Sequence, residues 1–176
     1  MKVPLIALLA LTAATAAAPS LALAHVVAAP GEAKAGSYSA IAFRVGHACG
    51  AGDTTLKLRV EIPDAVASVR PQPKPGWTID IEKSGDRATS VTWTGRLPDD
   101  QFDDFPLLMK LPAQSDKEGA GTLAFPVIQT CEKGESQWTE IADPERPTEK
   151  LTHPAPTVRL TPAVAETMPA MPGMKH

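Results

Sequence analysis

The chain has 176 residues, with 17 Lys and Arg against 20 Asp and Glu, and its formal net charge is −3 at pH 7. A chain with no basic stripe is not expected to bind nucleic acid. The 18 Pro and 12 Gly predict many turns and exclude an architecture of long helices.

The first 24 residues predict a secretory signal peptide. A lysine near the start is followed by an almost entirely apolar stretch at 3–18, and Ala22 and Ala24 are the small residues that a signal peptidase requires. The apolar stretch is short for a membrane span, which needs ~20 residues. We therefore expect cleavage between Ala24 and His25, a periplasmic or secreted destination, and no stable membrane span in the mature chain.

Short alternating runs of apolar and polar residues predict β-strands through the rest of the chain. The clearest run is 56–62, where one face is apolar and the other polar, as in a half-buried antiparallel sheet. In chain order, the expected strands are 37–45, 56–62, 66–69, a hairpin of 77–81 with 90–94, 105–111, 121–128, 137–141 and an edge strand at 157–160. Without a convincing amphipathic helix, the expected fold is all-β: an antiparallel sandwich of the immunoglobulin or fibronectin type III kind over residues 25–161.

Residues 162–176 differ in composition from the predicted domain. Their prolines and small side chains predict a disordered tail. The tail carries four side chains that can bind metal, namely Met168, Met171, Met174 and His176. Thioethers are soft ligands that select Cu(I), so these residues are candidate Cu(I) ligands, although composition alone explains them equally well.

The two cysteines, Cys49 and Cys131, both lie in the predicted mature chain. In an oxidising compartment two cysteines most simply form one disulfide. Closing a loop of roughly 80 residues contributes on the order of 4 kcal/mol to stability in the chain-entropy model. The alternative is a pair of thiolate metal ligands. A disulfide would bring the Gly-rich loop that contains His47 and Asp53 close to the strand of Trp138.

Cleavage before His25 would create a metal chelate from a single residue. The α-amine and the imidazole of an N-terminal histidine can close a ring on a metal, and Cu(II) favours nitrogen ligands in tetragonal geometry. The α-amine, with a pKa of ~8, can deprotonate when copper is present. His47 and Asp53 are candidates for completing such a site.

Each of these residues also has a simpler interpretation. His25 is then only the residue that follows the cleavage site. His47 then packs beside the disulfide or faces solvent, and Asp53 caps a turn, as Asp before a strand usually does. Trp138 is then an ordinary core aromatic.

Several short motifs along the chain form a combination that is specific, although no single motif is. They are His25-Val26 after the signal, Pro30, Gly36-Ser37-Tyr38, His47-Ala48-Cys49, Thr55 with the strand to Ile62-Pro63, Lys74-Pro75-Gly76-Trp77, Val91-Thr92-Trp93, and Gln129-Thr130-Cys131 through Gly134 to Trp138. The combination spans roughly residues 25–160 and resembles the YcnI-like copper-binding domain of bacteria, in its proteobacterial form.

The resemblance implies a β-sandwich that binds one Cu(II) per chain. It implies that the ligands are the amine and imidazole of the N-terminal His and a carboxylate, with a Trp close to the metal. His25 and Trp138 match these positions, and Asp53 is the acidic residue nearest to the carboxylate position. His47 belongs to the proteobacterial form and is the alternative or additional ligand. A role as a copper chaperone or storage protein, with another copper-handling protein as partner, is also implied.

Two rival classes of function stay open. An N-terminal His chelate is also used by copper monooxygenases that attack polysaccharides, but this chain has a single Tyr and no obvious flat substrate platform. A β-sandwich can also serve as a metal-free interaction module. Motifs for hydrolases, kinases and disulfide oxidoreductases are absent from the sequence. We therefore predict a non-enzymatic copper-binding protein of the periplasm or the exterior.

Overall fold

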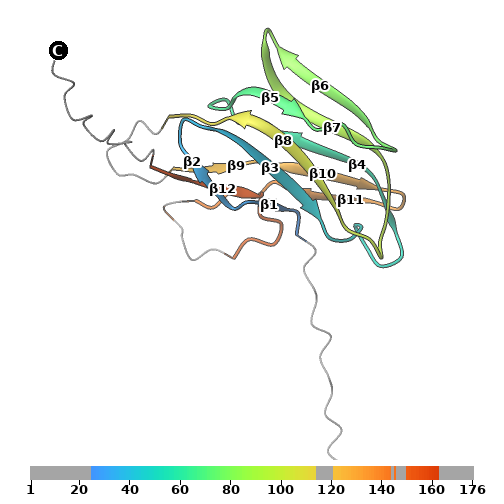
Figure 1. Cartoon of the computed structure of the whole chain (residues 1–176). Coiled ribbons are helices and arrows are strands. Elements are labelled where there is room, and N and C mark those ends of the chain that lie inside the picture. The colour runs from blue at the N-terminus through green and yellow to red at the C-terminus, as the bar shows by residue number, and fades with distance from the viewer. Residues whose placement is uncertain (1–24, 114–120, 144, 146–149, 163–176) are drawn as a thin grey trace, which may run out of the picture.

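The computed structural model describes residues 25–113, 121–143, 145 and 150–162, and within these ranges it contains twelve β-strands and no helix (Figure 1). Accordingly, this described part includes no helix long and apolar enough to cross a membrane. The predicted signal peptide and most of the predicted tail, with Met168, Met171, Met174 and His176, lie outside the described residues.

The strands form three sheets. The first has the order β1 (Val27–Ala29), β3 (Tyr38–Val45), β8 (Asp103–Lys110) and β5 (Ala67–Pro71). The second has the order β11 (Glu135–Trp138), β10 (Val127–Cys131), β4 (Thr54–Glu61), β7 (Arg87–Pro98) and β6 (Thr78–Ser84). The third and smallest has the order β2 (Glu32–Lys34), β12 (Thr157–Thr161) and β9 (Thr122–Ala124). All pairs are antiparallel except β2 with β12, which is parallel.

The two larger sheets enclose one apolar core (Figure 1). Aromatic side chains make contacts between the two sheets. The Trp93 ring on β7 lies 5.5 Å from the Phe105 ring on β8. The Phe43 ring on β3 lies 5.4 Å from that of Phe125, which precedes β10. Both pairs meet edge to face, the geometry that aromatic rings prefer. The predicted all-β sandwich is confirmed.

The local alternation predicted most strands, but it did not predict β1 and β2, and the run expected at 137–141 is strand only as far as Trp138, the last residue of β11. Two further expectations differ from the structure. The expected strand at 121–128 is divided at Phe125 and Pro126 into β9 and β10, which belong to different sheets. Pro126 has no backbone N–H and cannot continue the ladder. The strand at 157–160 is not at an edge, because β12 lies between β2 and β9.

The predicted disulfide is confirmed. Cys49 and Cys131 are bonded, with their Cα atoms 6.1 Å apart. The bond ties the loop after β3 to the end of β10, so that the loop lies against the second sheet. The alternative, in which two thiolates bind a metal, does not apply to bonded cysteines.

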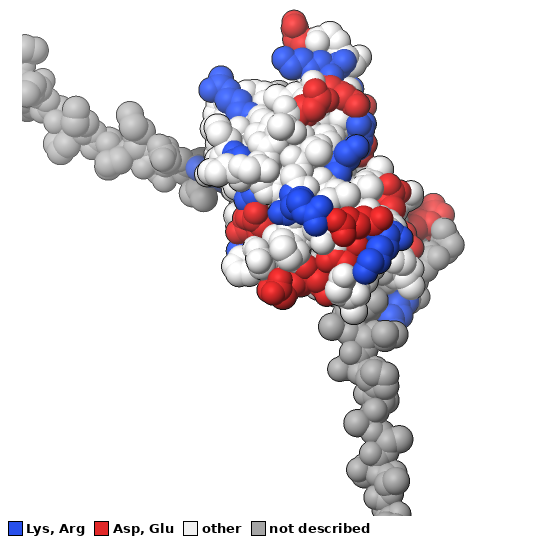
Figure 2. Space-filling model, turned by 90° about the vertical axis from the view of Figure 1, so that its right-hand side faces the viewer, with Lys and Arg blue, Asp and Glu red and all other residues white. Residues whose placement is uncertain are grey.

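Acidic and basic side chains lie next to one another on the face shown in Figure 2. Among the described residues, ion pairs connect neighbouring strands, as between Arg44 on β3 and Asp104 on β8 at 2.8 Å. The Arg44 guanidinium also lowers the pKa of the Asp104 carboxyl through two hydrogen bonds. Exposed pairs of this kind contribute little, about 0–1 kcal/mol each, so the buried core dominates the stability.

Candidate functional site

Trp138, at the end of β11, contacts two imidazole rings. Its ring centroid lies 5.5 Å from that of His25, with 51° between the planes. It lies 5.3 Å from that of His153, with 46° between the planes. Trp138 is 4% exposed, whereas His25 is half-buried and His153 is exposed. His25, which is far in the sequence from the other two residues, therefore contacts the same indole as His153 at the surface of the sandwich.

A buried hydrogen-bond chain fixes the orientation of the indole. Trp138 Nε1 donates to Gln129 Oε1 over 3.2 Å. Gln129 Nε2 in turn donates to the carbonyl oxygen of His47 and to Thr55 Oγ1, each over 2.8 Å. Gln129 is 1% exposed, so these bonds satisfy polar groups that water does not reach. The indole N–H points into the protein, and part of the ring is left to face the two histidines.

The segment of residues 150–156, here called the strap, places His153 next to Trp138. Glu140 holds this strap with its carboxylate, which accepts the backbone N–H groups of Thr152 (2.7 Å) and His153 (2.9 Å) and the Thr152 hydroxyl (3.0 Å). The backbones also pair, since Glu140 N donates to His153 O and Ala155 N donates to Glu140 O. The hydrogen bond from the backbone of His153 is the largest cause that lowers the pKa of Glu140. The carboxylate is thereby kept charged and bound to the strap.

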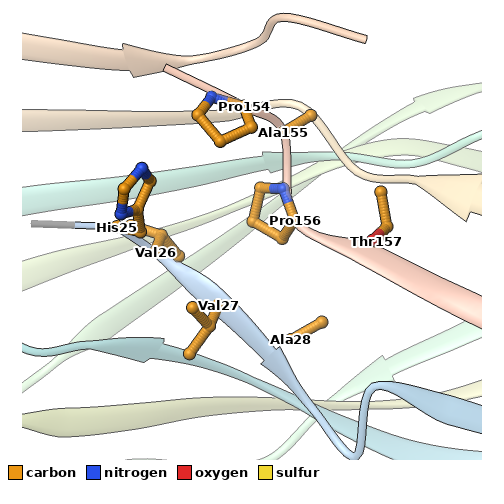
Figure 3. A pocket seen from close by; sticks show the side chains of 8 residues that line it. All are labelled: His25, Val26, Val27, Ala28, Pro154, Ala155, Pro156 and Thr157. Atoms are coloured by element: carbon orange, nitrogen blue, oxygen red, sulfur yellow. The ribbon is translucent and has the colours of Figure 1, made fainter. Parts of the chain in front are cut away.

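His25 stands at one end of a small pocket. The pocket has a volume of ≈ 260 Å³ and is lined by 25–28 on one side and 154–157 on the other. Figure 3 shows that His25 and Pro154 lie at the same end of it, whereas Ala28 and Thr157 lie at the other. Val26, which is 3% exposed, anchors this stretch to the core directly after His25. The packing of Val26 therefore fixes the backbone next to His25.

The two other predicted ligands lie on the loop between β3 and β4. Asp53 is 6% exposed, and its Oδ1 accepts the backbone N–H groups of Thr54 (2.7 Å) and Lys133 (3.3 Å). It thus fixes the turn that follows Cys131. The His47 side chain lies close enough to Asp99 for its charge to contribute to the lowered pKa of that carboxyl, which is caused mainly by the backbone N–H groups of Gly52 and Ala48.

The structure therefore brings some predicted residues together and not others. His25 and Trp138 meet, and the backbone of His47 reaches Trp138 through Gln129. Among the described residues, no three His, Cys, Asp or Glu side chains form a group that could hold a metal ion. The set of His25, Asp53 and His47 is accordingly not assembled into one such group.

His153 is the residue that the sequence analysis did not identify. The chain has only four histidines, and this scarcity was the one signal that pointed to it. Its neighbours are polar or proline, so the local pattern predicts an ordinary loop. Only the pairing of the strap with Glu140 places its ring against Trp138.

A family model described as a domain of unknown function (DUF1775) matches residues 25–160. The chain belongs to the DUF1775 family. Its resemblance to the YcnI-like domain is thereby confirmed, whereas its assignment to the proteobacterial form stays a prediction. The match begins at His25 and ends within β12, so it includes all three rings of the site.

Two further comparisons characterise this DUF1775 domain. It is 28% identical over 128 residues to the copper-binding protein CutI of Bacillus subtilis (strain 168), an alignment that covers 70% of this chain and 59% of that protein. The chain thus spans less than two thirds of that relative. A crystal structure of an uncharacterized protein from Nocardia farcinica, described as immunoglobulin-like, superposes with a TM-score of 0.61 at 32% identity and covers 78% of this chain and 98% of the other. The predicted immunoglobulin-like class is confirmed.

Proposed function

We propose that this protein is an exported copper-binding protein that is cleaved before His25 and binds one Cu(II) through the amine and imidazole of that residue. The proposal includes a role in copper homeostasis, as a chaperone that delivers copper to another protein. The single observation that carries it is the position of His25, whose ring lies against buried Trp138 and which lines one end of a small pocket. The relative from Bacillus subtilis, whose name describes copper binding, supports the choice of metal.

The donors at this place suit copper as cargo. An imidazole and an amine from one residue supply two nitrogens, and Cu(II) prefers nitrogen ligands in tetragonal geometry. The amine exists only when the bond to Ala24 is cut, which the start of the family match at His25 supports. The Trp138 indole donates only through Nε1, which is already bonded to Gln129. The indole therefore acts as an apolar wall beside the metal rather than as a ligand.

Asp53 and His47 remain candidates for completing the site. They differ in the hydrogen bonds that each would have to give up in order to bind the metal. Asp53 Oδ1 already accepts two backbone N–H groups, and turning it toward a metal would leave them without this acceptor. His47 is half-buried and lies near Asp99. Asp53→Asn and His47→Ala, each made in the chain that starts at His25 and titrated as described next, test the two candidates: a ligand's loss should weaken binding or change the nitrogen couplings.

Titration of Cu(II) into the chain that starts at His25, followed by electron paramagnetic resonance, tests the proposal. The matched control is the same chain with Ala24 retained, which keeps the imidazole but blocks the amine. We expect a tight one-to-one site with nitrogen couplings in the cut form only. Equal binding by both forms would show that internal residues hold the metal, and no binding by either would favour a metal-free interaction module.

A second measurement addresses the chaperone role and its enzymatic rival. We expect copper-loaded protein to transfer its metal to an apo acceptor faster than free exchange allows. No faster transfer would contradict the chaperone role and leave copper binding in place. Peroxide-driven oxidation of a polysaccharide by the loaded protein would instead identify a copper monooxygenase.

A further inference from the structure

We propose that His153 supplies a second imidazole to the metal bound at His25, so that the two histidines and Trp138 form one centre closed by the strap. This inference rests on the proposed copper binding at His25 and adds a ligand to it. The first observation is that both imidazoles lie against the same indole, at 5.5 Å and 5.3 Å between ring centroids. These two distances mean that the centroids of the two imidazoles are at most about 11 Å apart.

The course of the backbone indicates that the two histidines belong to the same end of the site. Residues 25–28 and 154–157 form its opposite walls, and His25 and Pro154 mark the same end (Figure 3). The chain segments that follow these two walls also run in the same direction, because β2 and β12 pair in parallel, with Glu32 opposite Arg159. Because the two stretches run side by side in one direction, His153, which directly precedes Pro154, falls beside His25 rather than at the far end.

Glu140 binds both the backbone N–H and the backbone carbonyl of His153. The His153 N–H is bound by the Glu140 carboxylate, and the His153 carbonyl accepts the Glu140 N–H over 3.1 Å. Two residues further on, Ala155 is 5% exposed, and its backbone N–H donates to the backbone carbonyl of Glu140. A ligand on a backbone fixed in this way loses little freedom when it binds, which favours affinity. His153 itself is exposed, so a metal ion can reach its ring from solvent.

The chemistry of the donors agrees with this placement. Once the bond to Ala24 is cut, His25 supplies two nitrogens, and His153 adds a third. Three nitrogens suit the tetragonal preference of Cu(II). A centre of this kind needs only two side chains, because its third donor is the amine of His25, and it is therefore compatible with the absence of a group of three His, Cys, Asp or Glu side chains among the described residues.

The experiment counts the imidazoles bound to Cu(II) in the chain that starts at His25. Pulsed electron paramagnetic resonance detects the remote nitrogen of each bound imidazole, and two bound rings give combination lines that one ring does not. We expect two imidazoles in the unchanged protein and one in His153→Phe, which keeps an aromatic ring beside Trp138 but removes the donors. Competition with a chelator should show a copper affinity lower by roughly tenfold or more in His153→Phe.

His153→Ala and His47→Ala distinguish the two candidates for the second imidazole, since each removes one ring. We expect His153→Ala to resemble His153→Phe and His47→Ala to leave the imidazole count unchanged. One imidazole in the unchanged protein, or an unaltered count and affinity in both His153 variants, would overturn the inference while binding at His25 stands. Failure of the unchanged protein to bind copper at all would overturn both proposals.

Discussion

At the scale of single residues, Trp138 connects the surface site to the buried interior. Its ring contacts His25 and His153, and its N–H satisfies Gln129. Sequence analysis singled out Trp138 but could not distinguish a core aromatic from one beside a metal. The structure shows that the ring is both buried and in contact with the histidines, because it sits at the end of a strand.

Trp138→Phe tests the buried half of this role. The change removes the donor to Gln129 Oε1 and leaves that acceptor buried without a partner, which costs about 1–3 kcal/mol beyond the loss of volume. Urea unfolding measures the change. Trp93→Phe is the control, because no hydrogen-bond partner for Trp93 Nε1 occurs among the described residues and no acceptor is orphaned there. An equal loss in both variants would contradict the importance of the hydrogen bond to Gln129.

At the scale of elements, the strap and its attachment to Glu140 decide where His153 lies. Hydrogen bonds hold the pKa of Glu140 below its ordinary value of 4.5. A group whose pKa is lowered on folding stabilises the folded state above its unfolded pKa. That contribution is lost as the pH falls through the lower, folded pKa. The strap should therefore stay attached at neutral pH and loosen only in acid.

An NMR titration of the amide resonances of Thr152 and His153 tests this attachment. We expect both resonances to shift together as Glu140 is protonated, because the protonated carboxyl accepts the N–H groups less well. The pH midpoint of the shift should lie below 4.5, since the pKa of Glu140 is lowered from that value. Glu140→Gln should abolish the transition, whereas Glu135→Gln should not, since Glu135 bonds to Thr130 and Gln137. A midpoint at or above 4.5 would mean that the carboxylate does not hold the strap.

At the scale of the whole molecule, the Cys49–Cys131 bond holds the loop after β3 against the second sheet. The cysteines are separated by 82 positions, and a loop of this length contributes about 4–5 kcal/mol in the chain-entropy model. We expect the double variant Cys49→Ala/Cys131→Ala to lose about that much free energy of unfolding in urea. The unchanged protein unfolded under reducing conditions is the comparison, and a loss below about 1 kcal/mol in both would show that packing alone holds the loop.

The sequence by itself determined the features that depend on near neighbours or on simple counting. Alternation in 56–62 and in the hairpin around Gly85 predicts strands because successive side chains point to opposite faces of a sheet. Two cysteines leave one intrachain pairing, which the structure contains, whereas the cleavage site before His25 stays a prediction from the small residues that precede it. None of these inferences requires knowledge of which strands lie side by side.

Only the tertiary structure decided which distant residues meet. Pro126 interrupts the strand expected at 121–128, and the two resulting strands, β9 and β10, belong to different sheets. In the smallest sheet, β12 lies between β2 and β9. Asp53 turns to Lys133 N, and His153 reaches Trp138 because Glu140 pairs with the strap. Such contacts depend on the register and order of strands far apart in the chain. A local pattern carries no information on either, so the second histidine of the site is visible only in the folded molecule.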